Sequence, residues 1–137
     1  MLRPESRVRA RALQLLYAWD LQDRPPIREV ADRLLGAHGA RGPGWNEAET
    51  LAAAVAALAP ELDAEIGAAV EGWRPERIGV VERNILRLGL HELEQETAPP
   101  RVVIDEALRL AHWFAGAKAP AFVNGVLDAL ARQRGRL

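Results

Sequence analysis

Residues 122–128 of this 137-residue chain read FVNGVLD, and they can be read in two ways. An Asn-Gly pair between apolar residues is typical of a tight β-hairpin. The apolar residues Phe122, Val126 and Leu130 also recur at the spacing of one face of a helix. Because no other segment offers a strand for a hairpin to pair with, we predict a helix here.

The rest of the chain carries helical apolar stripes separated by prolines and glycines. We expect the first helix to open at Pro4 and Glu5, with an apolar stripe made of Val8, Ala12, Leu15, Leu16 and Trp19. Further apolar stripes predict helices over 27–35, 51–58, 62–73, 80–96, 104–114 and from 122 onward. Asn46 and Glu49 are expected to cap the third expected helix, and Pro60 to start a new one. Gly125 is expected to allow close helix packing. Periodicity does not decide whether Trp113 lies in the core or on the surface. The sequence therefore predicts an all-α bundle of about seven short helices.

Composition indicates one globular domain, with 49% hydrophobic and 27% charged residues. The absence of cysteine excludes a disulfide framework, a Cys-based zinc site and a Cys nucleophile. The three histidines lie in different segments, so we expect no metal, no cofactor and no catalytic residues. Nothing resembles a signal peptide or a membrane span, so we expect a cytoplasmic protein. The net charge of −1 argues against bulk non-specific binding to nucleic acid but leaves room for a local basic patch.

The first expected helix has a cationic face. Arg7, Arg11 and Gln14 lie roughly opposite its apolar stripe, and Arg9 adds charge on one flank. Tyr17 lies beside this stripe, away from the core. Single-stranded RNA is bound in this way, with Arg on phosphates and an aromatic ring under a base. The alternative is a solvated amphipathic helix with Tyr17 at its edge, and the pattern alone leaves both open.

A second charged cluster lies on the expected helix over 80–96. Arg83 and Arg87 are four residues apart with His91 one turn further, which suits a solvated face and a binding face equally well. Glu82 and Glu92 project into the apolar arc of the same helix. The rise of about 15 Å between them is too long for an acid/base pair. We expect both carboxylates to meet Arg partners from a neighbouring helix.

Four collinear stretches resemble the NusB family of transcription antitermination factors. They read RARALQLLYAW at 9–19, ERNILRL at 82–88, VVIDEA at 102–107 and FVNGVLD at 122–128. The resemblance implies a single NusB-like domain, 1–137, with two packed three-helix-like subdomains at about 1–58 and about 60–137. It also implies a protein that binds rather than catalyses. Its partners would be boxA-type single-stranded RNA of ribosomal RNA leaders, the ribosomal protein NusE and the RNA polymerase antitermination complex. Some family members also form homodimers.

The resemblance also assigns an RNA-binding surface. By motif position this surface comprises Arg7, Arg9, Arg11, Tyr17, Glu82, Lys118 and Phe122. Arg83 and Arg87 are added to it as candidates from the second charged cluster. Family members often carry an acidic residue where this chain has Lys118. The lysine favours phosphate and puts an acidic contact to a base donor in doubt.

Two other functions stay open. A NusB-like domain also occurs at the N-terminus of certain ribosomal RNA cytosine methyltransferases. The chain has no Rossmann-type glycine motif and no cysteine nucleophile, so it could be such an enzyme only as a fragment. The other alternative is a purely protein-binding helical adaptor whose basic helix is incidental. Measuring RNA binding with and without NusE separates these functions.

Overall fold

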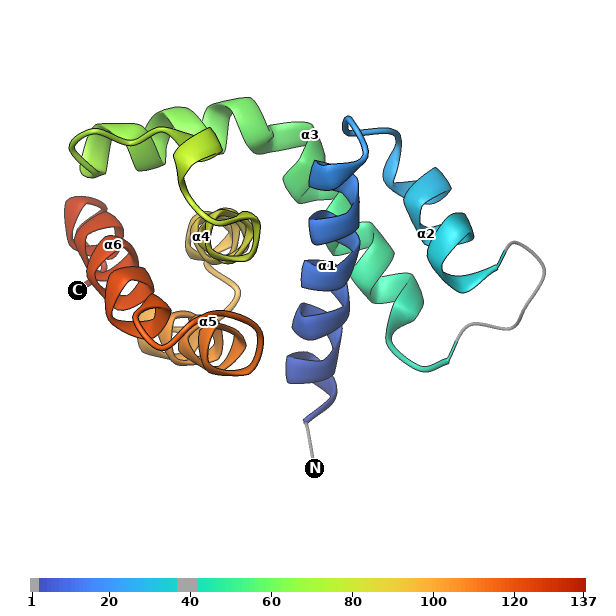
Figure 1. The fold of residues 1–137 in the computed structure, drawn as a ribbon. Coiled ribbons are helices and arrows are strands. Elements are labelled where there is room, and N and C mark those ends of the chain that lie inside the picture. Colours follow the sequence, from blue (N-terminus) through green and yellow to red (C-terminus); the bar gives the residue numbers. More distant parts are fainter. Residues whose placement is uncertain (1–2, 37–41) are drawn as a thin grey trace. The chain divides into compact units, whose positions relative to one another are not determined.

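The computed structural model describes residues 3–36 and 42–137, and every regular element among these residues is helical (Figure 1). The elements are α1 (Pro4–Leu21), α2 (Ile27–Leu35), α3 (Trp45–Ala69), the 3-10 turn η1 (Pro75–Arg77), α4 (Val80–Gln95), α5 (Pro100–Phe114) and α6 (Ala119–Gln133). The all-α prediction is confirmed, and FVNGVLD lies inside α6 rather than in a hairpin. Residues 37–41, His38 among them, lie outside the described residues.

Helix α3 is one continuous helix where two were expected, so the described chain has six α-helices instead of about seven. A proline inside a helix removes one backbone hydrogen bond. Here Pro60 follows an alanine-rich stretch, and alanine favours helix most strongly. Its neighbours Ala59 and Leu62 are buried in the core. Asn46 and Glu49 lie within α3 rather than capping it. The Asn46 carbonyl accepts a hydrogen bond from Thr50 Oγ1 at 3.1 Å, and Glu49 pairs with Arg28 at 3.7 Å.

The chain divides into two compact units, Met1–Leu58 and Ala59–Leu137, and the division falls within α3. In the first unit α1 packs against α2, and the buried face of α1 carries Leu15, Leu16 and Trp19. These are the residues that the 3.6-residue period places inward. The predicted core stripe of α1 is therefore confirmed.

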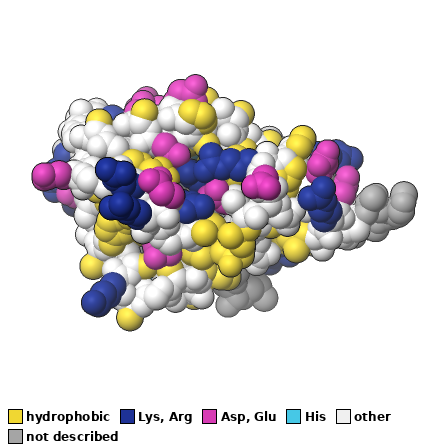
Figure 2. Space-filling view, turned by 45° about the horizontal axis from the view of Figure 1, so that its top comes forward, with side chains coloured by type: hydrophobic (Ala, Val, Ile, Leu, Met, Phe, Trp, Pro, Cys, Tyr) yellow, Lys and Arg dark blue, Asp and Glu magenta, His cyan; other side chains and the backbone are white. Residues whose placement is uncertain are grey.

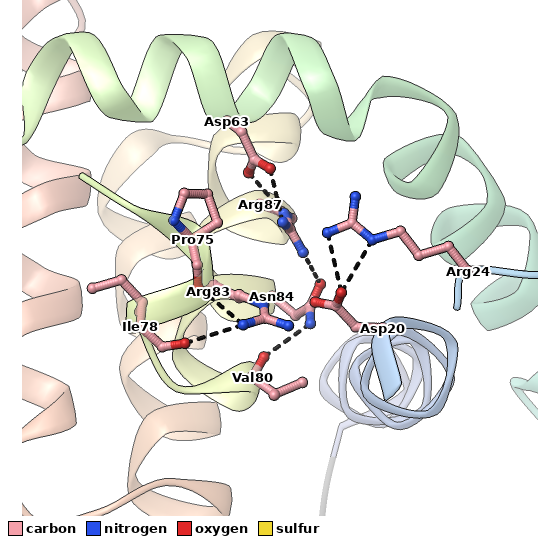
Figure 3. A network of polar contacts seen from close by, with 9 residues as sticks. All are labelled: Asp20, Arg24, Asp63, Pro75, Ile78, Val80, Arg83, Asn84 and Arg87. Atoms are coloured by element: carbon pink, nitrogen blue, oxygen red, sulfur yellow. Dashed lines mark hydrogen bonds and ion pairs between the residues drawn. The ribbon is translucent and has the colours of Figure 1, made fainter. Parts of the chain in front are cut away.

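The turn between α1 and α2 bends through two non-glycine residues with positive φ, Asp23 at 58° and Arg24 at 56°. Such a conformation is unfavourable for L-residues, and contacts of Arg24 offset the cost. Its backbone N–H donates to the Trp19 carbonyl at 3.0 Å, and its guanidinium lies 4.7 Å from the centroid of the Trp19 ring. The same guanidinium pairs with Asp20 at 3.1 Å (Figure 3). These contacts of Arg24 fix the end of α1.

In the second unit α4, α5 and α6 pack against one another (Figure 1). The close approach of α4 and α6 occurs at Gly89, where a Cβ would lie 2.8 Å from Leu127 Cδ1. Gly125 is exposed on α6, and a Cβ there would meet no atom within 4 Å. The expectation that Gly125 permits close packing is wrong, because its position on α6 faces away from the core.

Candidate nucleic-acid interface

Tyr17 presents its ring on the outer face of α1, with 43% of the residue exposed. Its neighbours Leu15, Leu16 and Trp19 are buried, so the ring is held on a helix anchored in the core. Arg7 and Arg9, on the same helix, are half-buried. The stems of long cationic side chains often pack along the surface while the charged head stays in water. Helix α1 therefore combines an accessible aromatic face with positive charge.

Arg11 differs from the free cation that the helical stripe predicted. Its guanidinium lies 4.9 Å from the centroid of the Trp45 ring, a cation–π contact with the start of α3. A Cβ at Gly44 would lie 3.1 Å from Arg11 Nη1, so the loop closes over this atom. That Nη1 is buried and has no hydrogen-bond partner among the described residues. The expected continuous cationic stripe is interrupted at Arg11, because the loop before α3 covers that position.

Arg87 is wholly buried, which corrects the expectation of an exposed Arg83–Arg87–His91 face on α4. Its Nε and Nη2 donate to Asp63 Oδ1 and Oδ2, both at 2.8 Å, in a bidentate ion pair between α4 and α3 (Figure 3). Its Nη1 donates to Asn84 Oδ1 at 3.0 Å. Arg87 thus serves the interior of the second unit and has no accessible surface to offer a ligand.

Arg83 holds the segment that leads into α4. Its Nη1 donates to the carbonyl oxygens of Pro75 at 2.9 Å and Ile78 at 3.2 Å (Figure 3). Asn84 Nδ2 donates to the Val80 carbonyl at 2.8 Å in the first turn of the same helix. The Arg83 side chain is half-buried, and these bonds position η1 relative to α4.

Glu82 bends back over the N-terminus of α4. A Cβ at Gly79, the N-cap residue, would lie 2.6 Å from each carboxylate oxygen of Glu82. A carboxylate at the third helical position is favoured there, because the start of a helix carries partial positive charge. The expected Arg partner is not found, since Glu82 forms no ion pair with any residue that the structure describes. Gly79 leaves the space that this arrangement needs.

The corner between α5 and α6 gathers aromatic and cationic side chains. Lys118 is exposed at the N-cap position of α6, and Phe122 is half-buried one turn later. Trp113 and Phe114, at the end of α5, are 44% and 41% exposed. Their ring centroids are 6.4 Å apart and the rings are nearly perpendicular, at 87°. Periodicity did not decide whether Trp113 is buried, and the structure places it on the surface at the end of α5.

Charges of both signs are interspersed on the molecular face of Figure 2, where Asp and Glu side chains lie beside Lys and Arg. No group of His, Asp and Glu that could hold a metal ion occurs in residues 3–36 and 42–137. Within the same ranges no helix is both long and apolar enough to cross a membrane. The features suited to an anionic ligand are therefore local ones, on α1 and at the α5–α6 corner.

Comparison with known proteins gives matches over most of the chain. Residues 6–132 match the NusB family. A transcription antitermination protein NusB from Solibacter usitatus is 39% identical over 130 residues, which cover 93% of this chain and 88% of the relative.

Solved structures agree over almost the same length. T. maritima NusB superposes with a TM-score of 0.83 at 27% identity, covering 97% of this chain and 94% of that one. A chain from a crystal structure of antitermination factors NusB and NusE in complex with dsRNA gives a TM-score of 0.78 at 31% identity. The match covers 97% of this chain and 99% of that one. The protein described here therefore belongs to the NusB family.

Proposed function

We propose that this protein is a transcription antitermination factor that binds boxA-type RNA of ribosomal RNA leader transcripts and pairs with NusE. The observation that carries the proposal is the similarity, over 97% of this chain, to a chain solved with antitermination factors NusB and NusE and dsRNA. Relatives named as antitermination proteins support the same role. The complex would help to keep elongating RNA polymerase, in the cytoplasm, resistant to termination.

Two separate features of the chain are proposed to contact RNA. On α1, the exposed ring of Tyr17 offers a stacking surface, and Arg7 and Arg9 supply charge for phosphates. At the α5–α6 corner, Lys118 supplies an exposed cation near Phe122. The other candidates, Arg11, Glu82, Arg83 and Arg87, would act indirectly, by fixing the elements that carry these features.

The proposed mechanism is assembly rather than turnover. The relative from Solibacter usitatus is an antitermination protein that this chain matches over 88% of its length, which favours the factor over a methyltransferase domain. A purely protein-binding adaptor would leave the exposed Tyr17 ring without a role. RNA bound jointly with NusE uses this ring.

The test is a titration with fluorescently labelled boxA-type single-stranded RNA, in the absence and presence of NusE. A scrambled RNA of equal length and composition is the control, and an RNA duplex is measured beside them because the related structure holds dsRNA. We expect boxA-type RNA to bind more tightly than the scrambled RNA, and NusE to strengthen the binding. Binding of NusE without any RNA affinity would leave the helical adaptor as the function.

A further inference from the structure

The end of α5 exposes two large aromatic side chains side by side. Trp113 and Phe114 are 44% and 41% exposed, and their rings meet edge to face. Aromatic side chains contribute most when buried, so two adjacent exposed rings offer a ligand a favourable apolar surface. An edge-to-face pair leaves ring faces free, unlike a stacked pair, and free faces are what a nucleobase needs.

The charge of the surrounding sequence indicates what kind of ligand fits. The chain has 19 acidic residues, yet none occurs between Glu106 and Asp128. The charged residues of that stretch are Arg109 and Lys118. Neither forms an ion pair with a residue that the structure describes, and both are exposed. The segment 107–127 therefore carries only positive charge of its own, which suits a polyanion.

Two cations lie close to Trp113 along the chain. Arg109 lies one turn before Trp113 on α5, and residues four apart are neighbours on a helix surface. Lys118 lies in the short turn that follows α5, at the start of α6. An exposed ring that has a cation before it and another after it in the chain suits a single-stranded RNA, in which each base lies between two phosphates.

We propose that Trp113 stacks on an unpaired base of the bound RNA, while Arg109 and Lys118 neutralise the phosphates on either side of that base. Phe114, through its edge contact, holds the Trp113 ring in place. The inference rests on the proposed function and adds Trp113 and Arg109 to the residues that contact RNA. A protein segment is the competing occupant, but it offers no reason for the missing acidic residues.

The test compares Trp113→Ala and Trp113→Phe with wild type in titrations with boxA-type single-stranded RNA. Trp113→Ala should bind about 5-fold to 150-fold more weakly, the range that one stacked base contributes. Trp113→Phe keeps a ring and should retain most of the affinity. The matched control is Leu34→Ala, which truncates another half-exposed apolar side chain, on α2, and should bind RNA like wild type.

A second set of measurements identifies the base and keeps folding separate from binding. RNAs with one abasic nucleotide are titrated against wild type and Trp113→Ala. At the stacked position the two losses should not add, because both remove the same contact. Arg109→Gln, which leaves the ring untouched, should reduce the magnitude of the log–log salt slope by about 0.7.

The outcomes separate this inference from the proposed function. If wild type binds RNA and Trp113→Ala binds equally well, the stacking role is wrong and the proposed function stands. If wild type binds no RNA, both are wrong. If Trp113→Ala loses affinity for NusE but not for RNA, the aromatic pair contacts a protein and the inference is overturned.

Discussion

Tyr17 is the residue whose proposed role one substitution tests most directly. Because its ring is 43% exposed, Tyr17→Ala should leave the melting temperature nearly unchanged. The loss of a stacked base should lower the RNA-binding free energy by about 1–3 kcal/mol. Trp19→Ala is the matched control, since truncating a buried aromatic costs roughly 3–5 kcal/mol of stability. Unchanged RNA affinity in Tyr17→Ala would remove Tyr17 from the binding site.

Arg7 and Arg11 should differ, although both lie on the same side of α1. Arg7→Ala should weaken RNA binding and reduce the magnitude of its log–log salt slope by about 0.7. Arg11→Ala should change that slope less and lower stability instead, by about 0.5–2 kcal/mol, because it removes the contact with Trp45. Titrations at several salt concentrations, with thermal melts of both variants, make the comparison. An equal slope change in both would show that Arg11 leaves Trp45 to meet RNA.

Periodicity predicts which way a side chain points but not what covers it. The exposure of Tyr17 and the burial of Leu16 follow from the helical period of α1 alone. The period of α4 could not show that Arg87 is buried, because its partner Asp63 lies 24 residues away on another helix. Arg11 was misplaced for the same reason, since Trp45 lies beyond α2. Contacts of this kind depend on how helices pack, which no local pattern contains.

At the scale of the element, two glycines inside helices offer a matched pair of substitutions. Gly125→Ala should stabilise the protein by about 0.5–1 kcal/mol, because alanine favours helix and its Cβ would meet open space. Gly89→Ala gains the same propensity but drives a Cβ to within 2.8 Å of the buried Leu127 side chain. Overpacking of this kind typically costs 1–3 kcal/mol. Gly89→Ala should therefore have a lower free energy of unfolding than Gly125→Ala, by about 1–3 kcal/mol, and should unfold at a lower denaturant concentration.

Denaturant melts of both glycine variants beside wild type check this prediction. If Gly125→Ala were the less stable of the two, the exposed face of α6 would have a structural role that its open surroundings do not show.

The limits of the helices were largely predictable, because prolines and glycines mark them. Helices α1 and α5 begin at Pro4 and Pro100, where a missing N–H costs nothing. Helix α4, predicted over 80–96, spans Val80–Gln95. The prediction that Pro60 starts a new helix was wrong. A proline can lie inside a helix when nearby alanines and buried neighbours outweigh the free-energy cost of its missing hydrogen bond. The surroundings of a proline, rather than its presence, decide between a break and a continuous helix.

At the scale of the whole molecule, net charge is a poor guide to the ligand. The chain carries a net charge of −1, yet no acidic residue interrupts the stretch between Glu106 and Asp128. Binding strength and its salt dependence are set by the cations that meet phosphates, not by the sum over the surface. The resemblance could suggest RNA because its motifs span both units, whereas composition alone argued against bulk nucleic-acid binding.

The stability of the whole molecule should depend on pH through His91. This side chain is buried in α4, and burial lowers its pKa below the ordinary value of 6.5. The unfolded chain therefore binds a proton at a pH where the folded protein does not, so the free energy of unfolding falls as pH decreases below about 6.5. Uptake of one such proton lowers the free energy of unfolding by at most about 1.4 kcal/mol per pH unit. Denaturant melts between pH 7.5 and 5.5 should show this loss, and His91→Gln should flatten it, whereas an unchanged pH profile in that variant would assign the dependence to other groups.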